Sequence, residues 1–127
     1  MGPIYLDNAA TTAVDASVVE AMGQCMMNTY GNPSSAHHMG IEAERLIERA
    51  RTQVADVLEA KPDSIVFTSG GTEANNLAVQ GVLCDLIDKG VKGHIITTAI
   101  EHASVARVFD WLESKGFSLT RLCVNQK

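Results

Sequence analysis

A short apolar stretch at residues 65–67 leads through a glycine pair directly into a helix-forming sequence. Gly70 and Gly71 let the backbone come close to a ligand, and the first N–H groups of a helix attract an anion. Thr72 can cap that helix or donate its hydroxyl to the anion. The stretch has neither the Gly-Lys-Ser/Thr of a P-loop nor the three-glycine spacing of a dinucleotide site. It therefore predicts a seat for a single phosphate group.

An ordinary strand-to-helix turn is the alternative interpretation of this stretch. Glycine marks turns more often than binding sites, and a lone Gly-Gly-Thr is weak evidence for a ligand. The local sequence leaves both interpretations open.

Short β-prone stretches alternate with helical ones in the second half of the chain. Strands are predicted at residues 65–67, 94–98 and 117–124, and a helix at about 73–88. Another helix has an apolar face and ends at Gly116; the face comprises Val105, Val108, Phe109 and Leu112. Strands joined through helices of this length are parallel, so the pattern predicts an α/β fold with a mainly parallel sheet and flanking helices.

The first half of the chain predicts two amphipathic helices. The first covers about residues 15–28, and the second ends before the Lys61-Pro62-Asp63 break. Their apolar stripes, expected to face a core, are Val14, Val18, Met22 and Met26 in the first helix and Leu46, Ile47, Ala50, Val54, Val57 and Leu58 in the second. The turn formers at residues 30–35 separate the two helices.

Size and composition exclude several classes of protein. With 127 residues and 46% apolar content, the chain is one folding unit or part of one. A net charge of -5 without a basic stripe argues against nucleic acid, and the apolar runs fall short of the roughly 18 residues that cross a membrane. Cys25, Cys84 and Cys123 suit buried, reduced thiols in the cytoplasm, and no paired ligand spacing indicates a metal site.

His102 follows the predicted strand at residues 94–98, on the carboxyl-end side of the sheet where residues 70–72 are also expected. Ligands of open α/β sheets bind outside those strand ends, so the two loops are predicted to converge on one crevice. His94, at a strand start, is a weaker candidate. The alternative is that His102 merely binds a neighbouring backbone group.

Four blocks of sequence together resemble one enzyme family. They lie at residues 5–12, 31–38, 68–76 and 100–102, in the order found at the start of NifS/IscS-type cysteine desulfurases. These are class V aminotransferase-fold enzymes that use pyridoxal 5′-phosphate. The resemblance implies that residues 15–127 are an incomplete part of the large, cofactor-binding domain of the fold type I enzymes. It also implies that residues 1–14 lie near the substrate end of the site.

The resemblance also implies roles for individual residues. Gly71 and Thr72 match the segment that binds the cofactor phosphate, and His102 matches a histidine that stacks on the pyridine ring and moves protons. The family reaction converts cysteine to alanine and leaves sulfur on an enzyme thiolate as a persulfide, for iron–sulfur cluster or thio-cofactor assembly. Selenocysteine lyases and related class V enzymes share these blocks, so the substrate stays open between sulfur and selenium.

Family members are much longer, and some residues essential to their chemistry have no counterpart among residues 1–127. The lysine that binds the cofactor should follow a Ser/His-rich stretch, unlike Lys61, Lys89, Lys92, Lys115 and Lys127, and no cysteine has the setting of the nucleophile. We therefore expect the chain to be inactive alone and completed by a C-terminal part, in cis or in trans. Expected partners are cysteine, an iron–sulfur scaffold or other sulfur acceptor, and a second copy in a homodimer. A non-catalytic remnant that binds a partner is the alternative.

Overall fold

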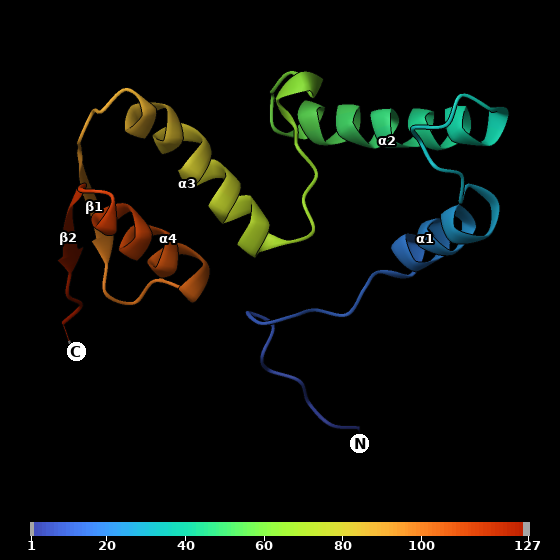
Figure 1. Ribbon diagram of the computed structural model, residues 1–127. Coiled ribbons are helices and arrows are strands. Elements are labelled where there is room, and N and C mark those ends of the chain that lie inside the picture. The colour runs from blue at the N-terminus through green and yellow to red at the C-terminus, as the bar shows by residue number, and fades with distance from the viewer. Residues whose placement is uncertain (1, 126–127) are drawn as a thin grey trace. The chain divides into compact units, whose positions relative to one another are not determined.

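The computed structural model describes residues 2–125. The chain consists of two compact units, Met1–Ile65 and Val66–Lys127, each described here by itself. The first unit contains two α-helices, at Ala16–Asn28 (α1) and His38–Val57 (α2), and the second contains two further α-helices and the two strands (Figure 1). The assignment of residues 1–14 and 15–127 to different parts of an enzyme domain stays a prediction.

Both long helices of the first unit begin at a side-chain cap. In α1 (Ala16–Asn28), Asp15 Oδ1 accepts bonds from the N–H and hydroxyl of Ser17, at 2.8 and 2.6 Å. In α2 (His38–Val57), His37 Nδ1 accepts the N–H of Gly40 at 3.3 Å. The Asp15 cap satisfies an N–H group that has no acceptor inside its helix, whereas the Gly40 N–H also donates to the His37 carbonyl at 2.9 Å. The 3₁₀ turn η1 (Pro62–Ser64) follows and lies against α2.

The apolar stripes predicted for α1 and α2 are largely exposed, which corrects the expectation that they face a core. No residue of α1 is buried, and Met22 and Met26 are 50% and 68% exposed. The buried residues of α2 are small ones, Gly40, Ala43 and Ala55. Burial needs an opposing apolar surface, and the described part of this unit does not provide one for the large side chains of these helices.

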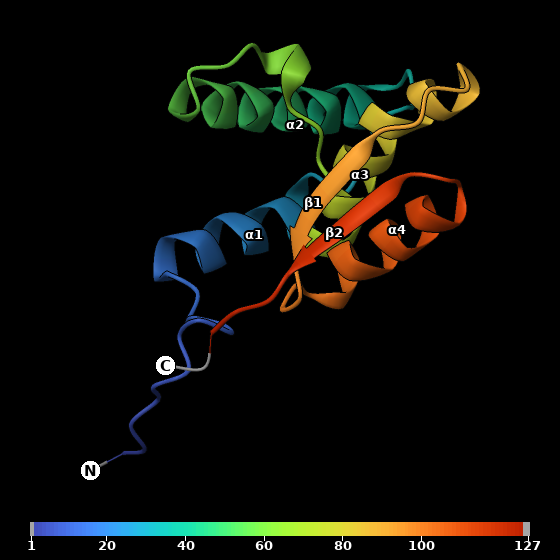
Figure 2. The ribbon, with the colours of Figure 1, turned by 90° about the vertical axis from the view of Figure 1, so that its left-hand side faces the viewer.

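The second unit is an α/β arrangement with parallel strands, as predicted. It runs α3 (Gly71–Asp88), β1 (His94–Thr98), α4 (Ala103–Ser114) and β2 (Ser118–Leu122). Strands β1 and β2 pair in parallel with Ile96 opposite Thr120. Both views show α3 and α4 on the same face of this sheet (Figures 1 and 2). The uncovered face leaves Ile96 64% exposed.

The strand predicted at residues 65–67 is wrong for this chain. Within residues 2–125 the sheet has only the strands β1 and β2, although Ile65 has an extended backbone. A β-strand exists only where a neighbouring strand shares its hydrogen bonds, and extended backbone alone does not make one. The Ile65 carbonyl instead accepts a hydrogen bond from the Arg51 guanidinium of α2.

A small apolar core holds the second unit together. Val108, Leu112 and Phe117 are buried, with Leu112 fully inaccessible, and Leu83 of α3 and Ile95 of β1 pack against them. Burial of Val108 and Leu112 confirms the predicted core face of α4. The helix then ends as predicted, with Gly116 in a left-handed conformation at φ 94°, which glycine adopts without strain. This core positions the loop after β1 and the start of α4.

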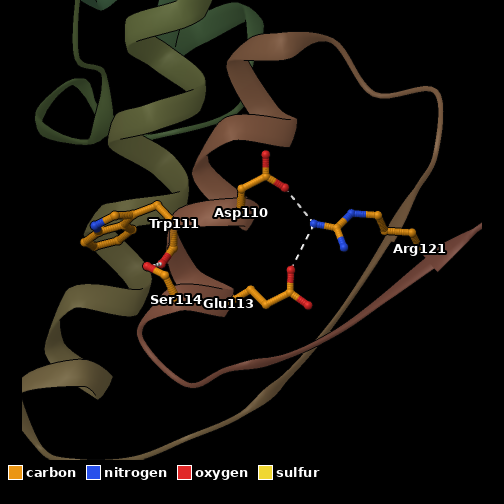
Figure 3. A network of polar contacts seen from close by, with 5 residues as sticks. All are labelled: Asp110, Trp111, Glu113, Ser114 and Arg121. Atoms are coloured by element: carbon orange, nitrogen blue, oxygen red, sulfur yellow. Dashed lines mark hydrogen bonds and ion pairs between the residues drawn. The ribbon is translucent and has the colours of Figure 1, made fainter.

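Arg121 of β2 joins the strand to α4 at the surface. Its Nη2 donates to Asp110 Oδ1 at 2.6 Å and to Glu113 Oε2 at 3.2 Å (Figure 3). The pKa of Arg121 is raised above its ordinary value, mainly by the hydrogen bond to Glu113. The three side chains are 41–56% exposed, so water screens the charges and the pairs add little to stability.

Within the part of the chain that the structure describes, no helix has the length and apolar character needed to span a bilayer. Cys84 and Cys123 are exposed, in contrast to the expected buried thiols, and Cys25 is half-buried. Cys123 also lies just after the end of β2 rather than within the strand. Among residues 2–125, no three His, Cys, Asp or Glu side chains cluster as metal ligands would.

Candidate functional site

The start of α3 differs from that of the other long helices because no side chain caps it. Gly70 is the N-cap residue, and the first bond within the helix runs from the Ala74 N–H to the Gly70 carbonyl at 3.0 Å. The N–H groups of Gly71, Thr72 and Glu73 therefore have no acceptor inside the helix. A Cβ atom placed on Gly71 would meet no atom from another part of the chain within 4 Å, so the space beside this residue is open.

Thr72 does not cap α3, which removes one of the two roles predicted for it. It is the second residue of the helix, after Gly71, and its side chain is exposed. A residue at this position has helical backbone and cannot also be the flanking cap. The hydroxyl beside the open N–H groups remains available to an anion.

Glu73 is hydrogen-bonded to the residue that precedes Gly70. Its Oε2 accepts the hydroxyl and the N–H of Ser69, both at 2.6 Å. The hydroxyl bond, followed by the backbone bond, holds the pKa of Glu73 below its ordinary value. The sequence interpretation did not predict this contact, although a Glu in the first turn after a Ser is a familiar sign of a helix start. It ties the loop before α3 to the helix.

His102 lies at the start of α4 and serves as its cap. The Nδ1 atom accepts the N–H of Ser104 at 3.1 Å and lies 2.8 Å from the Ser104 hydroxyl. The simpler alternative for His102, a bond to a nearby backbone group, is therefore what the structure shows for this nitrogen. The other nitrogen, Nε2, has no hydrogen bond recorded within residues 2–125, and the side chain is exposed. One nitrogen holds the ring, and the other has no protein partner among the described residues.

Two asparagines of α3 join the starts of the two helices. Asn75 Nδ2 donates to the Ser104 hydroxyl at 3.0 Å. Asn76 Nδ2 donates to the carbonyls of Thr72 and Ser104, at 2.8 and 3.3 Å. One amide thus contacts both the predicted phosphate seat and the turn that carries His102, so the two predicted loops lie together. Sequence reasoning missed these residues, and the Asn-Asn pair directly after Glu73 was the signal available.

The chemistry of these residues fits a phosphorylated aromatic cofactor. Open N–H groups and the positive end of the α3 dipole suit a phosphate, and the Thr72 hydroxyl adds a donor. The imidazole of His102 offers a flat face and a free nitrogen from the adjoining helix start. A separate open hollow of about 500 Å³ in the first unit contains none of the predicted site residues and is lined by Asn28, Thr29, Glu42, Arg45, Leu46 and Arg49.

Comparisons with known proteins cover almost the whole chain. The aminotransferase class-V family model matches residues 4–127. The chain is 47% identical to "Cysteine desulfurase IscS" of Dictyoglomus turgidum over 124 residues, which are 98% of this chain but 31% of the relative. These matches confirm the resemblance predicted from the four sequence blocks.

Solved structures confirm the predicted fold. One of a "NifS-like protein" has a TM-score of 0.82 and 43% identity, and the match covers 91% of this chain and 31% of that one. Another, "SspA in complex with cysteine", has a TM-score of 0.79 and 42% identity and covers 90% and 32%. The chain therefore has the fold of one part of these proteins and spans about a third of their length.

Proposed function

Because the chain belongs to the class V aminotransferase family, we propose that it is the N-terminal portion of a cysteine desulfurase and binds pyridoxal 5′-phosphate. The observation that carries the proposal is the uncapped start of α3, joined through Asn76 to the turn that presents His102. A helix start that served structure alone would gain from a side-chain cap such as those of α1 and α2.

Three residues of this chain would hold the cofactor. The N–H groups of Gly71 and Thr72, with the Thr72 hydroxyl, would bind the phosphate, and His102 would cover the pyridine ring. When bound, pyridoxal 5′-phosphate supplies the electron sink for reactions at the carbon atoms of an amino acid. The chain's own contribution is to anchor the phosphate and to orient the imidazole beside the reacting atoms.

The proposed substrate is cysteine, which would leave as alanine while its sulfur passes to an enzyme thiolate as a persulfide. The name of the Dictyoglomus turgidum relative and the cysteine bound to SspA support this choice. The Schiff-base lysine and the nucleophilic cysteine would belong to a C-terminal part in cis or in trans. An iron–sulfur scaffold or another cytoplasmic acceptor would take the sulfur, and the completed enzyme would be a homodimer.

A fusion enzyme tests the proposal directly. In it, residues 4–127 of this chain replace the matching stretch of the Dictyoglomus turgidum IscS. We expect the fusion to retain pyridoxal 5′-phosphate through dialysis and to form alanine from cysteine, measured by chromatography. The unmodified relative is the positive control. A fusion that melts cooperatively but neither retains the cofactor nor forms alanine would contradict the proposal and favour a partner-binding remnant.

A further inference from the structure

Ser104 is a buried polar residue at the point where α3 meets the start of α4. The residue is only 8% exposed, and its hydroxyl oxygen accepts a hydrogen bond from Asn75 Nδ2 at 3.0 Å. An amide nitrogen can only donate, so this contact uses a lone pair of the oxygen. The hydroxyl proton is then free to donate to His102 Nδ1, which lies 2.8 Å away.

Two donors therefore face the same nitrogen of His102. The Ser104 N–H approaches Nδ1 at 3.1 Å and the Ser104 hydroxyl approaches it at 2.8 Å. A ring nitrogen that accepts hydrogen bonds carries no proton, so the neutral imidazole must carry its proton on Nε2. The lone pair of a protonated Nε2 belongs to the aromatic system and cannot take up a proton.

We propose that Ser104, oriented by Asn75, is a positioning residue that holds neutral His102 with its proton on Nε2. The consequence for catalysis rests on the proposed function. Toward a bound cofactor or substrate, neutral His102 presents a hydrogen-bond donor at Nε2 and not a proton acceptor. Its accepting nitrogen is bound to Ser104, so an acid–base role at Nε2 would first require the ring to exchange its Nδ1 bonds.

The state of the ring is measurable in the full 127-residue chain without cofactor. Long-range ¹H–¹⁵N spectra of ¹⁵N-histidine-labelled protein distinguish a protonated from an unprotonated ring nitrogen. At a pH where the ring is neutral, we expect His102 to show an unprotonated Nδ1 and a protonated Nε2. A spectrum in which Nδ1 carries the proton, or in which the two forms are equally populated, would overturn the proposal.

Variants separate the hydroxyl from general packing. Ser104→Ala removes one donor to Nδ1, and we expect the ratio of the two tautomers to fall about fivefold, the effect of one net hydrogen bond. Ser104→Thr keeps the hydroxyl and should restore the ratio. Asn75→Asp replaces the donating amide by an acceptor that takes the Ser104 proton, and it should shift the ratio the same way as Ser104→Ala.

An unchanged ratio in both Ser104→Ala and Asn75→Asp would refute the positioning role. If Ser104→Ala does not fold, shown by loss of its thermal transition, the parent spectrum and Asn75→Asp still decide. The readout needs no turnover, so the two proposals can fail separately. The expected tautomer in an inactive fusion would contradict only the proposed function, whereas turnover with the proton on Nδ1 would contradict only this inference.

Discussion

The starts of α3 and α4 lie in the same unit and are joined by hydrogen bonds. They differ in whether a side chain accepts a hydrogen bond from the first N–H groups of the helix. His102 and its Nδ1 atom serve α4, whereas Gly70 offers α3 no side chain. At α4 the His102 side chain accepts one of the first N–H groups, and at α3 the N–H groups of Gly71 and Thr72 have no acceptor inside the helix. The contrast shows that the same backbone groups are satisfied by a side chain at one helix start and left without a cap at the other.

Replacing His102 should have the largest effect, because this residue caps α4 and is also proposed to contact the cofactor. In the fusion enzyme, His102→Ala and His102→Asn should each lower kcat about 10²- to 10³-fold, the range for loss of one positioned hydrogen-bond donor. Only His102→Ala should also lower the free energy of unfolding, by about 0.5–2 kcal/mol, because asparagine still caps α4. Steady-state kinetics and thermal melts measure the two effects. Unchanged kcat in His102→Asn would leave His102 with the capping role alone.

A carboxylate at the start of α3 should weaken cofactor binding and stabilise the helix. In Thr72→Asp, a carboxylate would repel a phosphate near the open N–H groups, at a cost of about 4 kcal/mol for unit charges at 4 Å near a protein surface. The same carboxylate should stabilise the helix in the free chain by about 0.3–1 kcal/mol through the dipole. Equilibrium dialysis of the cofactor against the fusion and melts of the 127-residue chain test these opposite signs. Tighter cofactor binding would show that the start of α3 is not the phosphate seat.

Removing only the hydroxyl should produce a smaller loss. Thr72→Ala should weaken cofactor binding to the fusion by about 1.5–3 kcal/mol, the value of a hydrogen bond to a charged group. Thr72→Ser keeps the hydroxyl and is the matched control, with affinity close to the parent. Equal affinities for all three proteins would mean that the side chain at position 72 does not contact the phosphate.

Acid should weaken the start of α3 slightly, through Glu73. The bonds from Ser69 lower the pKa of Glu73 from its ordinary value of 4.5, so ionised Glu73 stabilises the folded loop. That stabilisation is present above pH 4.5 and is lost as the pH falls through the lowered pKa. The hydrogen-exchange protection factor of the Ser69 amide, which is the ratio of the intrinsic to the observed exchange rate, should therefore fall in acid. Glu73→Gln, which carries no charge, should flatten this pH dependence.

The second unit was largely predictable from local sequence. The apolar face of α4, the glycine after it and the β-prone stretch at residues 94–98 each specify their element through nearby residues. The strand predicted at residues 65–67 failed for the opposite reason, because a strand depends on a distant partner that no local pattern supplies. The exposed stripe of α1 is a similar case: the pattern identifies the helix but not the surface that would cover it.

The candidate site was predictable as two loops but not as a network. Glycine and threonine at residues 70–72 and the histidine after β1 were visible as chemistry. The contacts of Asn75 and Asn76 with Ser104 span 28 or 29 positions in the chain, and they depend on how α3 packs beside α4. Sequence periodicity carries no information on such pairing of polar groups, whereas the folded chain shows it directly.

The single amide of Asn76 also restricts how this protein can vary. Any substitute must reach two carbonyls, those of Thr72 and Ser104, from one short side chain with two N–H donors. Aspartate has the shape but no donor, and leucine has neither. In a saturation library of position 76, most substitutions should therefore impair two proposed functions together: binding of the phosphate at Thr72 and orientation of the His102 imidazole.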